Sequence, residues 1–260
     1  MHVTAGYFII GVSFATFSSA VGLNTKEKGY RKMKSKEKRT LLTGSALMVI
    51  FIIWTLLIQA VDVRPVGVNG TSVGFAVLNS WFHQFTGVHM KLYVITDWLG
   101  LVPVAVCMLF GMVGLMQWVK RRKLSKVDFD IILLGVYYVI VIAGYLLFEI
   151  IPINYRPVLI EGILEASYPS STTLLVLSVM PTLTFQIKRK IENDAVKKML
   201  QSFINLFSAF MIAGRLVSGV HWLTDIIGAV LLSAGLFYIY KGIVLIHDRK
   251  SIRRERHGIT

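Results

Sequence analysis

The sequence predicts an all-α membrane protein, a polytopic bundle of seven spanning helices. Its 260 residues are 55% hydrophobic and only 16% charged, whereas soluble domains carry roughly 25% charged residues. Apolar stretches of about 20 residues recur along the chain, and a helix needs that length to cross a bilayer. Basic residues outnumber acidic ones by 28 to 14, and most lie between these stretches. The composition excludes a disordered protein and argues against an ordinary soluble enzyme.

Seven apolar runs divide the chain, and each is expected to form one spanning helix. The first three contain no charged residue, and the fourth is shorter but dense in Ile, Leu, Val and Tyr. The fifth starts with a polar third rich in Ser and Thr, the sixth runs into Arg215, and the seventh is interrupted only by Asp225. In chain order, the runs are residues 3–25, 41–61, 98–119, 131–148, 166–187, 199–214 and 222–240.

The basic residues between the runs predict the topology. Segments 26–39, 120–126, 188–198 and 241–256 hold 24 of the 28 Lys and Arg residues. These segments are alternate connections plus the C-terminal tail, so they share one side of the membrane, which the positive-inside rule makes the cytoplasm. The net charge of +14 therefore describes topology and not a nucleic-acid-binding surface. A short basic tail without a sorting motif favours a bacterial plasma membrane.

The first run, residues 3–25, is expected to be a retained anchor rather than a cleaved signal peptide. No basic segment precedes its apolar stretch, and the basic cluster follows instead, which places the N-terminus outside. Cys107 is the single cysteine and lies in an apolar run. A disulfide framework and a cysteine-rich metal site are both excluded.

Four basic residues fall on the opposite, extracytoplasmic side. Arg64 and Lys91 fit interfacial side chains whose charged ends reach water. Arg156 and Arg215 stand in polar segments, and a charged residue at the membrane end of a helix indicates a functional site. The polar segments that reach this face are 154–157, 168–173 and 214–225.

These segments supply the groups that phosphoryl chemistry needs. The guanidinium groups of Arg156 and Arg215 can bind phosphoryl oxygens in bidentate fashion. Ser170 opens a helix, where its hydroxyl stands beside unpaired backbone N–H groups that attract anions. His221 and Asp225 are four residues apart and share one helix face, so the carboxylate can fix the tautomer of the imidazole. Together they predict a nucleophile, its orienting group and a cationic cradle.

At these residues the chain resembles the type 2 phosphatidic acid phosphatase superfamily of membrane lipid phosphatases. The signature of that superfamily has three parts, K-x(6)-R-P, P-S-G-H and S-R-x(5)-H-x(3)-D. The third part is the most specific, because two spacings and three residue types agree. The matching residues are Arg156-Pro157, Pro169-Ser170 and Arg215-x(5)-His221-x(3)-Asp225.

The resemblance implies a domain organisation and a substrate class. A six-helix phosphatase core would span residues 41–246, after an extra transmembrane helix and a basic cytoplasmic loop at 1–40. A basic cytoplasmic tail would follow at 247–260. The substrate would be a lipid phosphate or diphosphate bound at the extracytoplasmic face, and the reaction would need no metal or other cofactor.

The resemblance also implies a role for each matching residue. His221 would attack phosphorus to form a phosphohistidine, Asp225 would orient it, and water would then release phosphate. The phosphoryl oxygens would be bound by Arg156, Ser170, Ser171 and Arg215.

Two positions break the pattern of the signature, and Gly214 in place of the serine before Arg215 is a milder change. Glu149 stands where the signature has lysine, and Thr172 replaces the histidine that protonates the leaving oxygen. Threonine is a poor general acid at neutral pH, and general acid catalysis contributes about 100- to 10,000-fold. A lipid diphosphate needs no such proton, because its leaving group is itself a phosphate. We therefore expect a preference for diphosphates, such as a polyprenyl diphosphate, over phosphatidate.

Alternatives to this function stay open at this stage. A catalytically impaired relative could bind phospholipid head groups or partners through Arg156 and Arg215. A transporter is disfavoured, because the charged groups cluster at one interface. Replacements for the missing lysine could be Lys91 or Arg64. Candidates for the missing acid on the same side are His83, His89, Glu161, Glu165 and Tyr168.

Overall fold

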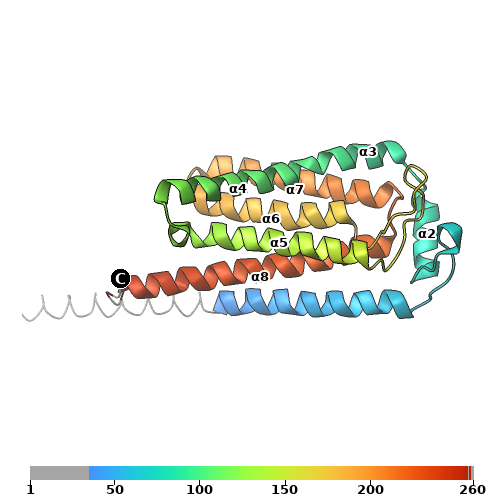
Figure 1. The fold of residues 1–260 in the computed structure, drawn as a ribbon, viewed down its shortest axis with the longest axis horizontal. Coiled ribbons are helices and arrows are strands. Elements are labelled where there is room, and N and C mark those ends of the chain that lie inside the picture. Colours follow the sequence, from blue (N-terminus) through green and yellow to red (C-terminus); the bar gives the residue numbers. More distant parts are fainter. Residues whose placement is uncertain (1–34, 257, 259–260) are drawn as a thin grey trace, which may run out of the picture.

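A computed structural model describes residues 35–256 and 258 of the chain, and this part is a bundle of long helices joined by loops (Figure 1). The predicted all-helical membrane bundle is confirmed. The expected first helix, at residues 3–25, lies outside the described residues. The helices are Ser35–Ala60, α2 (Ala76–Thr86), α3 (Met90–Leu99), α4 (Leu101–Arg121), α5 (Phe129–Ile150), α6 (Ser171–Lys190), α7 (Asp194–Val217) and α8 (Leu223–Arg256), with 3-10 turns η1 (Val68–Gly70) and η2 (Leu124–Lys126).

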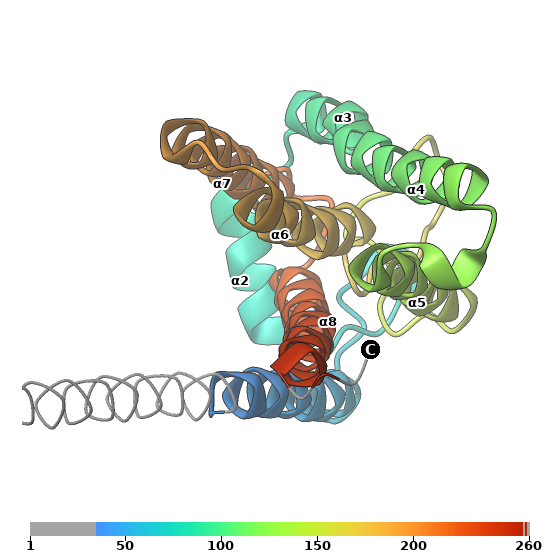
Figure 2. The ribbon, with the colours of Figure 1, turned by 90° about the vertical axis from the view of Figure 1, so that its left-hand side faces the viewer.

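Five of the described spans are long and apolar enough to cross a membrane, judged by length and composition. They are Ser35–Ala60, Met90–Arg121, Phe129–Ile150, Asp194–Val217 and Leu223–Arg254. The sixth long helix, α6, is not among these five spans and lies in the middle of the bundle, with neighbours on several sides (Figure 2). Its position explains its composition, since a central helix faces other helices and not lipid.

The helices are longer than the apolar runs that predict them. The run at 98–119 extends back to Met90 through α3, which continues into α4 at Gly100 with helical backbone angles. The run at 222–240 continues to Arg256, so most of the basic segment 241–256 is helical. Fully buried Val244 shows why, because α8 still packs against the bundle beyond its apolar run.

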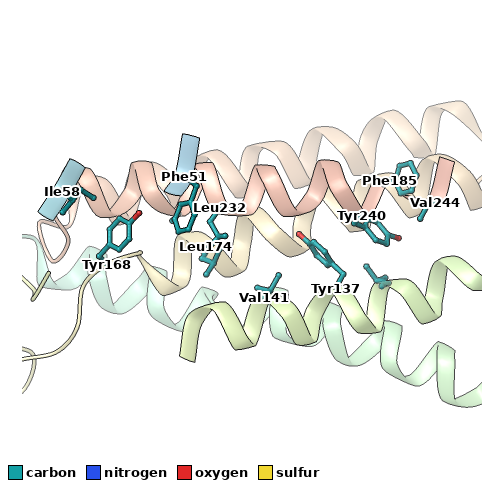
Figure 3. Packing of buried hydrophobic residues seen from close by; sticks show 12 residues of the cluster. Phe51, Ile58, Tyr137, Val141, Tyr168, Leu174, Phe185, Leu232, Tyr240 and Val244 are labelled. Atoms are coloured by element: carbon teal, nitrogen blue, oxygen red, sulfur yellow. The ribbon is translucent and has the colours of Figure 1, made fainter. Parts of the chain in front are cut away.

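Helix α6 anchors the core through both apolar and polar contacts. One apolar cluster, which includes Phe51, Tyr168, Leu174 and Tyr240, follows the length of the bundle between α5, α6, α8 and helix Ser35–Ala60 (Figure 3). Several polar groups of α6 are also paired inside the bundle, although Ser178 Oγ and Gln186 Oε1 have no hydrogen-bond partner. Tyr137 on α5 donates to the carbonyl of Ser178 at 3.0 Å, Tyr138 meets Thr182 at 2.8 Å, and Gln186 donates to Tyr240 at 3.0 Å. Such satisfied polar groups can lie in a membrane interior at little cost.

The two ends of the bundle differ in chemistry. The connections α4–α5 and α6–α7 and the C-terminal part of α8 lie at one end and carry the basic segments. The connections α5–α6 and α7–α8 lie at the other end, where the short helix α2 crosses the bundle (Figure 1). All three polar segments singled out in the sequence therefore meet at the α2 end.

Candidate active site

The α7–α8 turn presents His221 and is held in place by the α2–α3 connection. Gly219 in this turn has φ +70°, and an added Cβ would lie 2.0 Å from the carbonyl oxygen of Gly87, so only glycine fits. The ring of His83 contacts the Gly219 carbonyl at 3.1 Å, and the backbone N–H of His89 donates to Ser218 at 2.9 Å. These contacts fix the backbone that carries His221.

His221 and Asp225 are both buried and are joined through a serine. The Nδ1 atom of His221 lies 3.8 Å from Oδ2 of Asp225. The hydroxyl of Ser167 lies between them, 3.1 Å from this Nδ1, and donates to Oδ2 of Asp225 at 2.5 Å. Asp225 also accepts from the backbone N–H of Trp222 at 2.9 Å and from the Asn154 amide at 3.3 Å. The carboxylate is therefore held rigidly by three donors.

The contacts of the His221 ring assign its tautomer. Nδ1 lies 3.1 Å from the carbonyl oxygen of Ser167, which can only accept, so Nδ1 carries the proton. Nε2 then carries the lone pair, which accepts a hydrogen bond from Nη1 of Arg156 at 3.4 Å. Burial lowers the pKa of His221 to about 4, the nearby Asp225 carboxylate opposes this, and the charges of Arg156 and Arg215 lower it further. The imidazole is thus neutral at pH 7 and available as a nucleophile.

Arg156 is buried beside this lone pair in the α5–α6 connection. Its backbone N–H donates to the carbonyl of Glu165 at 3.1 Å, which joins the beginning and the end of the α5–α6 connection. Its Nε lies 2.9 Å from Oε2 of Glu165, although the alignment is not that of a hydrogen bond. The guanidinium also stands 5.8 Å from the centre of the Tyr93 ring.

Arg215, near the C-terminal end of α7, is 1% exposed and held by a different set of groups. Nη2 donates to the Thr172 hydroxyl at 2.5 Å and lies 3.3 Å from Oδ1 of Asp97. Nη1 donates to the Thr96 hydroxyl and the Tyr93 carbonyl, both at 3.4 Å, while Nε has no hydrogen-bond partner. The Tyr93 ring lies 4.8 Å from the Arg215 guanidinium, so both arginines face one aromatic ring.

Ser170 and Ser171 differ in what they offer to a ligand. Ser170 is fully buried, its N–H donates to the Asp225 carbonyl at 3.3 Å, and its hydroxyl donates to Thr173 at 3.0 Å. Both of its donors are therefore occupied by the protein. Ser171, at the first position of α6, lines a cavity instead.

A polar cavity of about 140 Å³ opens beside His221. Of the predicted catalytic, phosphate-binding and variant positions, four line it, namely Glu149, Arg156, Ser171 and His221, and two of the candidate acids, Glu165 and Tyr168, line it as well. Arg215, Ser170, Thr172 and Asp225 are not part of its wall. The complete lining is Tyr145, Phe148, Glu149, Arg156, Glu165, Ala166, Ser167, Tyr168, Pro169, Ser171 and His221.

A second, mostly apolar groove of about 500 Å³ lies between α4, α5 and α6. Its wall includes Val104, Val141 and Leu175 along the bundle, and Asp97 and Thr172 at the end near Arg215. Tyr145 and Ser171 belong to the walls of both the groove and the cavity. An apolar channel of helix faces therefore adjoins the polar cavity, as a ligand with a charged head and a hydrocarbon chain would require.

The family model of the PAP2 superfamily matches residues 105–247, which is more than half of the chain and contains both His221 and Asp225. This chain belongs to the PAP2 superfamily. A similar solved structure is the first transmembrane PAP2 type phosphatidylglycerolphosphate phosphatase from Bacillus subtilis. It is 16% identical, with 78% of this chain and 96% of that chain covered and a TM-score of 0.48. No curated protein matches the sequence.

The PAP2 signature positions that differ in this chain have clear surroundings. Glu149 ends in the polar cavity near the C-terminus of α5. Thr172 accepts a hydrogen bond from Arg215. Gly214 replaces the serine before Arg215, and a Cβ there would lie 2.6 Å from Cγ2 of Thr96. Helix α3 thus occupies the space into which that serine side chain would extend.

Of the five candidates for the missing acid, only Glu165 and Tyr168 line the cavity, and Tyr168 is turned into the core, where its hydroxyl meets Thr55 at 2.7 Å. His83 and His89 contact backbone carbonyls, and Glu161 is exposed. Lys91 and Arg64 are also exposed, with Arg64 paired to Asp62. Within the described residues, no three His, Cys, Asp or Glu side chains lie close enough to hold a metal ion.

Sequence reasoning missed four residues that shape this PAP2 site, namely Tyr93, Asp97, Asn154 and Ser167. Asp97 carried a usable signal, because it is an acidic residue just before a long apolar run. Asn154 is the first residue of the polar segment 154–157, and Ser167 directly precedes the segment 168–173. Their roles depend on how the α5–α6 connection folds. No sequence pattern places the Tyr93 ring against two distant arginines.

Proposed function

We propose that this protein is an integral membrane phosphatase that hydrolyses a lipid phosphate or diphosphate, with diphosphates preferred, at the extracytoplasmic face. One observation carries the proposal. His221 is buried and neutral, and its Nε2 lone pair accepts a hydrogen bond from Arg156 in a polar cavity next to an apolar groove. Core residues 41–246 would hold this machinery, with 1–40 and 247–260 as the added helix and tail.

The first chemical step forms a phosphohistidine. The phosphoryl group enters the cavity, and Arg156 turns from Nε2 of His221 to the phosphoryl oxygens. A guanidinium forms stronger hydrogen bonds with these anionic oxygens than with a neutral imidazole nitrogen. Nε2 attacks phosphorus, the bond from phosphorus to the leaving oxygen breaks, and that oxygen keeps the electron pair. The imidazole gains positive charge, which Asp225 stabilises through Ser167. Water then attacks phosphorus, releases phosphate and restores neutral His221.

The surroundings of Thr172 support the preference for a diphosphate. The Thr172 hydroxyl is bound to a permanently charged arginine and has no acidic proton to give. A leaving alkoxide would have to depart unprotonated, which is slow, whereas a leaving phosphate carries its charge at neutral pH. The apolar groove beside Thr172 would take the hydrocarbon chain of the substrate.

The extracytoplasmic location rests on charge. The site lies at the α2 end of the bundle, and the segments 120–126, 188–198 and 241–256 gather at the other end. The positive-inside rule assigns that other end to the cytoplasm. A cysteine introduced at exposed Glu161 should therefore react with a membrane-impermeant maleimide on intact cells, in a Cys107→Ser background.

The central test measures phosphate release by purified protein in detergent from a polyprenyl diphosphate, its monophosphate and phosphatidate. We expect the diphosphate to be fastest, and His221→Ala to lower the rate by about 1,000-fold or more, as loss of a nucleophile does. His89→Ala is the matched control, because His89 lies at the same end outside the cavity and contacts only Thr86 through its ring. Acid-labile phosphoprotein should form in the control and not in His221→Ala.

A second candidate function is a non-catalytic binder of phospholipid head groups. One observation favours it, since both arginines are paired with carboxylates, Arg156 with Glu165 and Arg215 with Asp97. The same test separates the two functions. Lipid binding without phosphate release from any substrate would support the binder, and hydrolysis that persists in His221→Ala would exclude the proposed mechanism.

A further inference from the structure

The polar cavity has walls of opposite charge. Arg156 and His221 form one part of its lining, and Glu149 and Glu165 contribute two carboxylates to the same space. Glu165 is paired with Arg156, whereas Glu149 forms no ion pair with any cation of the described part of the chain. Glu149 also stands where the PAP2 signature has lysine, so one charge in this cavity is reversed. An unpaired carboxylate beside a phosphate site would repel the phosphate.

This repulsion disappears if the ligand itself carries a positive charge next to its phosphate. The cavity has room for such a group, since it offers about 140 Å³ and one water needs only about 10–15 Å³ on the same measure. Arg156 is more than nine-tenths buried on its wall, and its Nε has no hydrogen-bond partner. The cavity therefore holds a buried guanidinium, which is shared with Glu165, and an exposed carboxylate, Glu149, which has no cationic partner among the described residues.

The aromatic residues of the lining indicate which kind of cation fits. Tyr145, Phe148 and Glu149 are spaced i, i+3 and i+4 on α5 and thus share one helix face, which borders the cavity. Aromatic faces attract organic ammonium groups through cation–π contacts, but phenyl rings are not ligands for Mg²⁺ or Ca²⁺. A carboxylate beside aromatic rings matches an ammonium better than a metal ion.

We propose that this cavity binds the ammonium group of a zwitterionic head group whose phosphate lies against Arg156 and His221. The inference rests on the proposed function and adds to the diphosphates named there a second group of substrates, lipid phosphates that carry a primary amine within a few bonds of the phosphorus. Glu149 accepts hydrogen bonds from the ammonium, the rings of Tyr145 and Phe148 cover it, and Glu165 lies within the same cavity.

The test compares two small phosphates that differ only in the amine, phosphoethanolamine and ethyl phosphate, as competitive inhibitors of lipid diphosphate hydrolysis. We expect phosphoethanolamine to bind about tenfold more tightly to the unmodified protein, the typical scale of one charge-assisted hydrogen bond. Glu149→Gln should remove most of this ratio. Glu149→Lys, which restores the signature residue, should reverse it in favour of ethyl phosphate.

Glu161→Gln is the matched control, since Glu161 lies in the same α5–α6 connection, is exposed and does not line the cavity. It should leave the ratio unchanged. Equal inhibition by both compounds in the unmodified protein would overturn the inference. Inhibition by ethyl phosphate that becomes stronger only when Mg²⁺ is added would also overturn it, because the carboxylates would then bind a metal ion.

The outcome is separable from that of the proposed function. Direct calorimetric binding of the same two compounds to detergent-purified protein needs no turnover. If no lipid is hydrolysed but phosphoethanolamine still binds more tightly through Glu149, the phosphatase proposal fails and the ammonium site stands. If His221-dependent hydrolysis occurs without any preference for the amine, the reverse holds. Size-exclusion profiles show whether each variant is folded. If Glu149→Lys does not fold, the test rests on Glu149→Gln alone.

Discussion

The two arginines of the site occupy similar settings with different neighbours. Each is buried, faces the Tyr93 ring and is paired with one carboxylate. Arg156 stands 3.4 Å from Nε2 of His221, whereas Arg215 is bound to Thr172 beside the apolar groove. Under the proposed function, the Arg156 half holds the complete nucleophile, and the Arg215 half, which would receive the leaving group, lacks an acid. The chemistry that survives best is therefore attack on phosphorus with a leaving group that needs no proton.

The largest effect should come from breaking the nucleophile half at Asp225. In Asp225→Asn the charge that stabilises the developing imidazolium is lost, and the amide NH₂ would compete with the Ser167 and Trp222 donors that now meet the carboxylate. We expect kcat for a lipid diphosphate to fall by about 100-fold or more, on the scale seen when an orienting carboxylate is neutralised. Steady-state phosphate release measures this effect.

Ser167→Ala is the graded companion of that variant, since it removes the link and keeps the charge. Its loss in kcat should be clearly smaller than that of Asp225→Asn. An equal loss would mean that the contact through Ser167, and not the charge of Asp225, supports His221.

The comparison of the two halves also shows where sequence reasoning succeeds. The spacing of Arg215, His221 and Asp225 is local to one helix–turn–helix segment, so the chain order alone places these residues near one another. The bundle is equally local in origin, because each long apolar run forms one helix. Both features follow from period and spacing without any tertiary knowledge.

The parts that sequence could not supply depend on contacts between distant segments. Ser167 links His221 to Asp225 only because the α5–α6 connection folds over α8, and Asp97 reaches Arg215 only because α3 packs against α7. The spacing i and i+4 predicted a direct contact from His221 to Asp225, while the turn at Gly219 leaves room for a hydroxyl between them. The role of Ser170 as a phosphate ligand stays a prediction, because its donors bond to protein groups here.

The leaving-group half should be repairable at Thr172. The position lines the groove of about 500 Å³, so an imidazole has space there. Thr172→His should raise phosphatidate hydrolysis by about tenfold or more, at the low end of what general acid catalysis contributes, with little change for a diphosphate. Phosphate release from the two substrates in parallel gives the ratio.

Thr172→Val controls for loss of the hydrogen bond from Arg215 without adding an acid. If it raises phosphatidate hydrolysis as much as Thr172→His does, the gain comes from freeing Arg215 and the missing-acid account is wrong.

The smallest expected effect lies in the pH profile, and it tests the nucleophile half alone. Burial and the charges of Arg156 and Arg215 hold the pKa of His221 near 4, against the opposing effect of Asp225. An ordinary histidine, with a pKa near 6.5, would be about nine-tenths protonated at pH 5.5 and useless as a nucleophile. Here the ring stays neutral, so kcat/KM for a diphosphate should change by less than about twofold between pH 7.5 and 5.5 from this group. It should fall only as the pH approaches 4.

The lowered pKa of His221 also makes the stability of the fold depend on pH. Because the unfolded chain binds a proton on this histidine below about pH 6.5 and the folded protein does not until about pH 4, acid destabilises the fold across that window. His221→Gln removes this contribution, so its melting temperature should decline less between pH 6.5 and 4.5 than that of the unmodified protein. A kinetic midpoint near 6.5, together with identical melting profiles, would show that His221 titrates as an exposed imidazole. The buried, neutral nucleophile that distinguishes the Arg156 half from the Arg215 half would then be lost.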